Sequence, residues 1–117
     1  GTLKRFIALQ ALGGQASREV LKALQARLFE RGRPDPVVMR QGLDILRDVD
    51  LRPELQHLDP PTLLIYGERD GLTPAPVGRW LASRLPDAEL EMLKDSAHAP
   101  FISHPERFVE RVCQFLK

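Results

Sequence analysis

Residues 62–66 form an apolar run that follows a pair of prolines and ends at Gly67. A short run that is apolar on both faces is typical of a strand buried on both sides in a parallel sheet. Thr73 and Pro74 then predict the start of a helix, and residues 88–92 alternate in polarity as a second strand does. The order of strand, helix and strand predicts a parallel α/β sheet with flanking helices.

The first half of the chain has a different periodicity, because residues 1–50 carry a helical pattern throughout. From Ser17, apolar residues recur at spacings of three and four, which predicts an amphipathic helix that ends near Gly32. The apolar stripe of this helix consists of Val20, Leu21, Leu24 and Leu28. Asp35 and Pro36 form a cap and first-turn pair that predicts a second helix. Its apolar face is expected to hold Val38, Ile45 and Val49.

A segment rich in proline, residues 51–60, separates the two halves and predicts an ordered connection more than a flexible linker. Near the end of the chain, Ser103 and Glu106 have the spacing of a capping box, which predicts a last helix. The side chains that this helix is expected to bury are Phe108, Val112 and Phe115. We therefore expect a helical region over residues 1–50 and an α/β region over residues 51–117.

Charge and composition exclude several classes of protein. A formal net charge of +1, with dispersed basic residues, argues against nucleic-acid binding. No apolar run approaches the roughly 20 residues of a membrane span, and no signal peptide is present, which predicts a soluble cytoplasmic protein without membrane contact. The single Cys113 excludes an internal disulfide and is expected to be a buried thiol. The three histidines lack further ligands at metal-binding spacing, so no metal or cofactor is expected.

Asp70 and His98 are the candidate catalytic residues. Asp70 follows the first strand and His98 follows the second, and reactive groups in parallel sheets gather at the carboxyl ends of the strands. A histidine that acts as general base needs a carboxylate to hold its other ring nitrogen. Each residue also has a structural alternative: Asp70 as a turn former that binds backbone amides, and His98 as a polar surface residue. Glu68 and Arg69, beside Asp70, are expected to be solvated.

No nucleophile accompanies this pair. The chain contains no Gly-x-Ser-x-Gly turn, and none of its serines has that setting; they are Ser17, Ser83, Ser96 and Ser103. The chain also begins at Gly1 without an initiator Met, which suggests truncation or processing. We therefore expect the C-terminal half of an enzyme whose nucleophile lies elsewhere.

Two motifs carry a resemblance to a known family. The order Leu-Leu-Ile-Tyr-Gly-Glu-Arg-Asp-Gly-Leu-Thr-Pro from Leu63, followed by His-Ala-Pro-Phe-Ile-Ser-His-Pro-Glu from His98, resembles the α/β-hydrolase superfamily. Within it, the chain is similar to the family of pimeloyl-[acyl-carrier protein] methyl ester carboxylesterases of biotin synthesis. Residues 5–10 and 42–52 resemble the cap region of that family. The resemblance implies a helical cap followed by the C-terminal part of an α/β-hydrolase core.

The resemblance also implies a function. Asp70 would orient His98, and His98 would remove the proton from a serine supplied by the N-terminal half of the same enzyme. The substrate would be a methyl ester of an acyl chain on acyl carrier protein, and the chain alone is expected to be inactive. Two alternatives stay open: another α/β-hydrolase, such as a lipase, a haloperoxidase-like enzyme or a carbon–carbon bond hydrolase, or a non-catalytic binding domain.

Two sets of binding residues follow from the same resemblance. The walls of the acyl channel are expected to include Phe6, Leu72 and Phe101, with core packing as the equal alternative for each. The acidic carrier protein docks on a basic part of the cap in this family, and residues 1–50 hold nine Lys or Arg against six Asp or Glu. The candidate basic face consists of Arg18, Lys22 and Arg27, an ordinary solvated helix face being the alternative.

Overall fold

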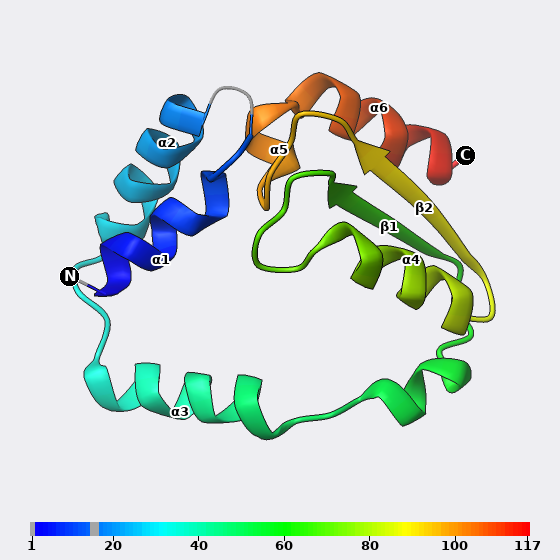
Figure 1. Ribbon diagram of the computed structural model, residues 1–117, viewed down its shortest axis with the longest axis horizontal. Coiled ribbons are helices and arrows are strands. Elements are labelled where there is room, and N and C mark those ends of the chain that lie inside the picture. The colour runs from blue at the N-terminus through cyan, green and yellow to red at the C-terminus, as the bar shows by residue number, and fades with distance from the viewer. Residues whose placement is uncertain (1, 15–16) are drawn as a thin grey trace.

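The computed structural model describes residues 2–14 and 17–117 (Figure 1). The first part of the chain is helical, and its helices are α1 (Thr2–Ala11), α2 (Ser17–Phe29) and α3 (Pro36–Asp48). A short 3-10 helix, η1 (Arg52–His57), leads to the α/β region. That region consists of β1 (Thr62–Gly67), α4 (Ala75–Arg84), β2 (Ala88–Leu93), α5 (Pro100–Ser103) and α6 (Pro105–Phe115). Gly1, Gln15 and Ala16, included in the helical prediction for residues 1–50, lie outside the described residues.

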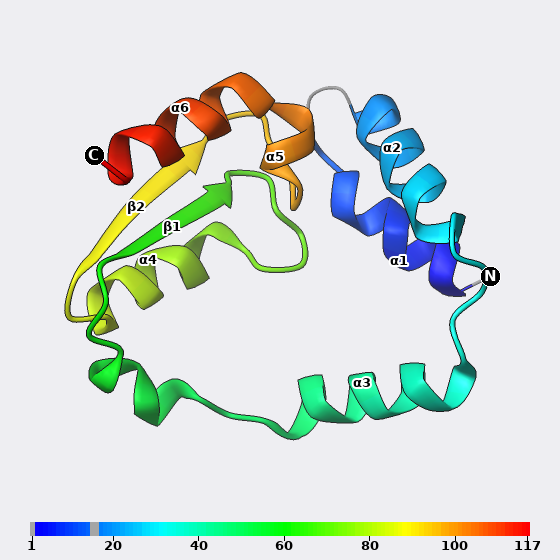
Figure 2. The same cartoon turned by 180° about the vertical axis from the view of Figure 1, so that it is seen from behind.

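The two strands pair in parallel, which confirms the predicted α/β sheet. The register runs from Thr62 opposite Ala88 to Gly67 opposite Leu93. Helices α4 and α6 cover opposite faces of the sheet (Figures 1 and 2). On the α4 side, a Cβ added to Gly78 would lie 2.9 Å from the ring of Tyr66, so the helix and the strand are in close contact.

The face of β2 that α6 covers is polar. Arg107 and Arg111, both on α6, form ion pairs with Glu91 of β2 at 3.3 Å and 3.5 Å. Arg111 also forms an ion pair with Glu89, two residues earlier on the same face of the strand. The alternation predicted for β2 therefore places its carboxylates toward α6.

The expectation that β1 is buried on both sides is wrong for this structure. Its side chains are only half-buried, although Gly67 at the end of the strand is buried. In the described residues the sheet has two strands, so each strand leaves one edge without a partner. Burial of a parallel strand requires neighbours on both edges as well as helices on both faces.

A hydrophobic core joins α1, α2 and the start of α5. Ala11, Val20 and Ala99 are buried there, and Leu21 and Leu24 pack against them. The predicted apolar stripe of α2 is thus confirmed over most of its length, but its last member, Leu28, is exposed. Helices α1 and α2 consequently lie against the loop that follows β2, as Figure 1 shows.

Helix α3 forms as predicted but contributes nothing to this core. Asp35 is its N-cap, and its carboxylate accepts a hydrogen bond from the backbone N–H of Val37 at 2.7 Å. The expected apolar face is exposed at Val38, Ile45 and Val49. Both views show α3 standing apart from the other helices (Figures 1 and 2).

The end of the chain differs from the prediction in two details. The capping box is not formed, because α5 ends at Ser103 and His104 occupies the N-cap position of α6. Cys113 is exposed instead of buried. It follows Val112, and one residue turns an α-helix by about 100°, which carries the thiol away from the half-buried face of α6. Within residues 2–14 and 17–117, helices are all too short or too polar to cross a membrane.

Gly67 allows β1 and the loop after β2 to approach each other, and its replacement should disrupt that approach. An added Cβ would lie 1.9 Å from the carbonyl oxygen of Ala97 and 2.5 Å from that of Ser96. We predict that Gly67→Ala lowers the free energy of unfolding by about 1–3 kcal/mol, the usual cost of overpacking. Urea unfolding followed by circular dichroism measures this.

Gly42→Ala is the matched control, because Gly42 lies inside α3 with nothing within 4 Å of an added Cβ. There, alanine should raise helix stability by about 0.5–1 kcal/mol. Equal effects of the two substitutions would contradict the close contact at Gly67.

Candidate active site

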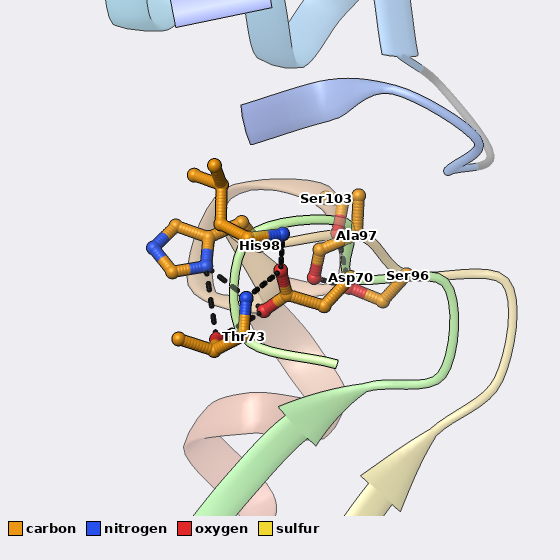
Figure 3. A network of polar contacts seen from close by, with 7 residues as sticks. Asp70, Thr73, Ser96, Ala97, His98 and Ser103 are labelled. Atoms are coloured by element: carbon orange, nitrogen blue, oxygen red, sulfur yellow. Dashed lines mark hydrogen bonds and ion pairs between the residues drawn. The ribbon is translucent and has the colours of Figure 1, made fainter. Parts of the chain in front are cut away.

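Asp70 and His98 meet at the carboxyl ends of the two strands. Asp70 lies three residues beyond the end of β1, and His98 lies five beyond the end of β2. The Nδ1 atom of His98 is 2.8 Å from Oδ2 of Asp70. Figure 3 shows the two side chains facing each other. The parallel pairing brings the two loops side by side, because parallel strands end at the same edge of a sheet.

The two oxygens of the Asp70 carboxylate have different partners. Oδ1 accepts hydrogen bonds from the backbone N–H groups of Leu72 at 2.8 Å and Thr73 at 2.9 Å. Oδ2 accepts from the hydroxyl of Thr73 at 2.8 Å and faces Nδ1 of His98 (Figure 3). The turn-forming role and the histidine-orienting geometry, posed as alternatives from the sequence, therefore coexist in one side chain.

These hydrogen bonds keep Asp70 ionised although its side chain is only 4% exposed. Burial by itself raises the pKa of a carboxyl group, and it is the largest single influence here. The hydrogen bonds from Thr73, His98 and Leu72 together outweigh it and hold the pKa of Asp70 below its ordinary value. At neutral pH the carboxylate is an acceptor only, so Nδ1 of His98 must donate to it.

Tyr66 lies on β1, and the pKa of its hydroxyl is raised. Burial is the larger cause, and the negative charge of Asp70 is the smaller one. Tyr66 is therefore protonated and uncharged at neutral pH, and Asp70 is the anion that faces the imidazole.

The second nitrogen of His98 is available for chemistry. With the proton on Nδ1, a neutral imidazole carries a lone pair on Nε2. Figure 3 shows this nitrogen pointing away from Asp70, and no hydrogen bond joins it to any of the described residues. The His98 side chain is 35% exposed, so Nε2 is open to a reacting group. This is the arrangement of a general base with its orienting carboxylate.

Thr73 is a functional residue that the sequence interpretation missed. Its hydroxyl donates to Asp70 at 2.8 Å, and its oxygen lies 3.3 Å from Nδ1 of His98, where it can share the same proton. The sequence interpretation used Thr73 only as a helix start. The signal that could have identified it is the spacing Asp-x-x-Thr, in which both the amide and the hydroxyl of the later residue can reach the earlier carboxylate.

Backbone and buried polar contacts fix the loop that carries His98. The N–H of His98 donates to the carbonyl of Gln10 at the end of α1, at 2.9 Å. The hydroxyl of the fully buried Ser96 lies 3.0 Å from that of Ser103, which in turn lies 2.7 Å from Nδ1 of His104. The loop is therefore held both by the helical region and by the start of α6.

Arg69 is exposed, as expected, and it also makes specific contacts. Its guanidinium forms an ion pair with Asp95 at 2.8 Å and donates to the carbonyl of Gly13 at 3.1 Å. Glu68 is exposed, as expected. No cluster of three or more potential metal ligands occurs in the described part of the chain.

The residues expected to line an acyl channel lie on three separate elements. Leu72 is half-buried beside Asp70, whereas Phe6 on α1 and Phe101 on α5 are 49% and 54% exposed. Phe101 makes an edge contact with the ring of Phe108, with 6.2 Å between the centroids. About half of the surface of Phe6 and of Phe101 is therefore not covered by core packing. The role of all three residues in an acyl channel stays a prediction.

The three basic residues of α2 are exposed but do not share one face. At 3.6 residues per turn, Lys22 lies about 40° around the helix from Arg18, whereas Arg27 lies about 180° from it. The expected single basic face therefore reduces to Arg18 and Lys22.

The comparisons with known proteins agree with this geometry. No family model matches the chain. The paired strands and flanking helices match part of the fold of solved α/β hydrolases, among them one from the metagenome of lagoon sediments at Mar Chica, Morocco, with a TM-score of 0.63, 23% identity, and coverage of 89% of this chain and 47% of that one. An esterase from Exiguobacterium antarcticum has a similar fold, with a TM-score of 0.63, 21% identity, and coverage of 97% of this chain and 48% of that one.

Over nearly its whole length the chain is similar to pimeloyl-[acyl-carrier protein] methyl ester esterases. The one from Chromobacterium violaceum is 43% identical over 99% of this chain, and the one from Yersinia enterocolitica is 44% identical over 97%. The chain spans 45% and 44% of the length of these two curated relatives. It therefore corresponds to less than half of each.

The hydrogen bond from the Thr73 hydroxyl should stabilise the protein at neutral pH, and this stabilisation should be lost in acid. Because the pKa of folded Asp70 is lowered, its contribution to stability is present above the unfolded value and is lost as the pH falls through the folded value. We predict that Thr73→Val raises the pKa of Asp70 and, at pH 7, lowers the free energy of unfolding by about 1.5–3 kcal/mol, the worth of a hydrogen bond to a charged group. Carbon-detected NMR titration of Asp70 and urea unfolding measure the two effects.

Thr62→Val is the control for that experiment, since the Thr62 hydroxyl donates to the neutral carbonyl of Pro60 at 2.9 Å. Its effect should be the same at pH 7 and at about pH 3, whereas that of Thr73→Val should shrink at the lower pH. A pKa of Asp70 that is unchanged in Thr73→Val would refute the account.

Proposed function

We propose that the chain is the part of a serine carboxylesterase that carries the acid and the base of the catalytic triad. The observation that carries this proposal is the 2.8 Å contact between Nδ1 of His98 and Asp70, which leaves Nε2 open. The similarity to curated esterases over nearly the whole chain supports it. The nucleophilic serine would come from residues outside this sequence, in the part of the enzyme that corresponds to the rest of the relatives' length.

The chemistry follows from the two side chains. Nε2 of His98 takes the proton of the serine hydroxyl as the serine attacks the ester carbonyl. The imidazolium that forms is stabilised by the buried Asp70 carboxylate, which stays ionised. Nε2–H then donates its proton to the departing methanol, and the acyl group remains on the serine. A water molecule, deprotonated by the same Nε2, releases the acid in the second half of the reaction.

The proposed substrate is a methyl ester of an acyl chain carried on acyl carrier protein, in the synthesis of biotin. The names of the curated relatives, which are 38% to 47% identical to the chain, support this choice. In this proposal residues 1–50 are the cap over the acyl channel, and residues 51–117 belong to the core. The proposed channel walls are Phe6, Leu72 and Phe101.

The exposed apolar surface supports the proposal that the rest of the enzyme packs against this chain. A groove of about 920 Å³ lies between η1 and α4, and its lining includes Leu51, Val77 and Trp80, all exposed. Helix α3 presents further exposed apolar residues next to it, including Leu43 and Leu46. Exposed apolar side chains in this number are typical of an interface. The chain by itself is proposed to be inactive, and the complete enzyme to be cytoplasmic.

A chimera provides the test of activity. The relative from Chromobacterium violaceum, with its matching C-terminal part replaced by this chain, should hydrolyse methyl esters and react with a fluorophosphonate. In the chimera, His98→Ala should lower kcat about 10³- to 10⁶-fold, because the general base is lost. Ester hydrolysis and fluorophosphonate labelling measure the loss.

His57→Ala is the matched control, since His57 is exposed and its side chain hydrogen-bonds, among the described residues, only to Gln56, at 3.4 Å. It should leave kcat unchanged. A folded chimera in which His98→Ala keeps full activity would contradict the proposal, and a folded chimera without any hydrolase activity would favour a binding domain.

Carrier-protein docking is proposed to use Arg18 and Lys22, which share one exposed side of α2. Reversing both charges to Glu should weaken binding of the acidic carrier at least about tenfold and leave hydrolysis of small methyl esters unchanged. Arg27→Glu, on the other side of the helix, is the control and should have a smaller effect. Titration calorimetry with acyl carrier protein measures the affinities, and equal affinities in all three proteins would discard this surface.

A further inference from the structure

Arg69 connects three segments that are far apart in the sequence. Its side chain forms the ion pair with Asp95, in the turn that follows β2, at 2.8 Å. Another nitrogen of the same guanidinium donates to the carbonyl of Gly13, in the helical region, at 3.1 Å. Its backbone N–H donates to the carbonyl of Ser96 at 2.9 Å. Because Arg69 directly precedes Asp70, these contacts tie the loop of the acid to the loop of the base and to the turn after α1.

The turn held by this ion pair has an unusual backbone. Asp95 has a φ of +58°, in the left-handed region that residues other than glycine rarely adopt. Asp and Asn tolerate this region better than most other residues. Asp95 lies three residues before His98, so the direction in which the chain leaves this turn sets the position of the imidazole.

The surrounding contacts leave little room for the His98 loop to move. A Cβ added to Gly14 would lie 3.1 Å from the backbone nitrogen of Ala97, and the N–H of His98 donates to Gln10. Both contacts join the end of the first helical segment to the His98 loop, the same two parts of the chain that Arg69 connects. A shift of the helical region relative to the sheet would therefore reach His98 through Arg69 and Asp95.

We propose that Arg69 is a positioning residue that fixes the geometry of Asp70 and His98 through Asp95 and Gly13. This inference rests on the proposed esterase function and extends it to a residue outside the triad. A guanidinium suits the task because its planar fork holds two acceptors in fixed directions, which an ammonium group does not. An ion pair as exposed as this one contributes little to stability, whereas a displacement of about 1 Å at a reacting group costs up to about 100-fold in rate.

The test compares Arg69→Met with Arg107→Met in the chimera. Both arginines form single ion pairs, and their side chains are similarly exposed, at 55% and 56%. Arg107 lies on α6 and pairs with Glu91, away from His98. Arg69→Met should lower kcat about 10- to 100-fold with KM within about twofold, whereas Arg107→Met should leave both unchanged. The two variants should lose similar, small amounts of Tm.

Two further variants separate positioning from general structural damage. Arg69→Lys keeps the charge but loses one of the two contacts, so it should restore part of kcat. Asp95→Asn keeps a residue suited to the left-handed backbone and loses the ion pair, and the double variant with Arg69→Met should be no slower than Arg69→Met alone. Additive losses, or a kcat for Arg69→Met within twofold of that for Arg107→Met, would overturn the proposal.

A spectroscopic measurement tests the positioning role of Arg69 independently of the proposed esterase activity. The Nδ1–H proton of His98, held by Asp70, should give a low-field proton NMR signal that is absent in His98→Ala. Arg69→Met should shift or broaden that signal, and Arg107→Met should not. If the chimera hydrolyses no ester but the signal responds to Arg69→Met, the esterase proposal fails and the positioning role stands. A signal that is identical in all the arginine variants overturns the positioning role.

Discussion

The placement of the Asp70 carboxylate is the constraint on which the rest of the site depends. A buried carboxylate is stable only where hydrogen bonds replace water, and Leu72, Thr73 and His98 supply them here. One oxygen builds the turn between β1 and α4, and the other orients the imidazole. The turn and the base are thus joined by one side chain, so a change in the loop geometry changes the chemistry.

This placement in turn requires two loops to approach more closely than side chains normally permit. Gly67 allows the end of β1 to lie against the backbone at Ala97, and Arg69 and Asp95 close the same region from the solvent side. The parallel register determines that both loops leave the sheet at one edge. The strands are only half-buried, and no residue of α3 is buried. Few segments of this chain therefore pack against the sheet.

Periodicity and motif spacing predicted the elements and placed Asp70 and His98 after two strands, whose carboxyl ends share one edge of a parallel sheet. The resemblance to a known family added the pairing of the two side chains. Periodicity and spacing did not predict burial correctly, because β1 is half-buried and Cys113 is exposed. The burial of a residue depends on which other segments pack against it, and a local sequence pattern does not contain that information. The roles of Thr73 and Arg69 were missed for a related reason. Short-range hydrogen bonds and ion pairs between distant segments depend on side-chain directions, and charged residues beside a turn ordinarily suggest solvent exposure.

The most direct measurement is a crystal structure of the complete chimeric enzyme with a phosphonate bound covalently to its nucleophile. The account predicts Nδ1 of His98 on Oδ2 of Asp70, as in this structure, with Nε2 within about 3 Å of the serine oxygen. It would be contradicted by an imidazole that faces away from the phosphonate, or by a carboxylate of Asp70 that binds only its own turn.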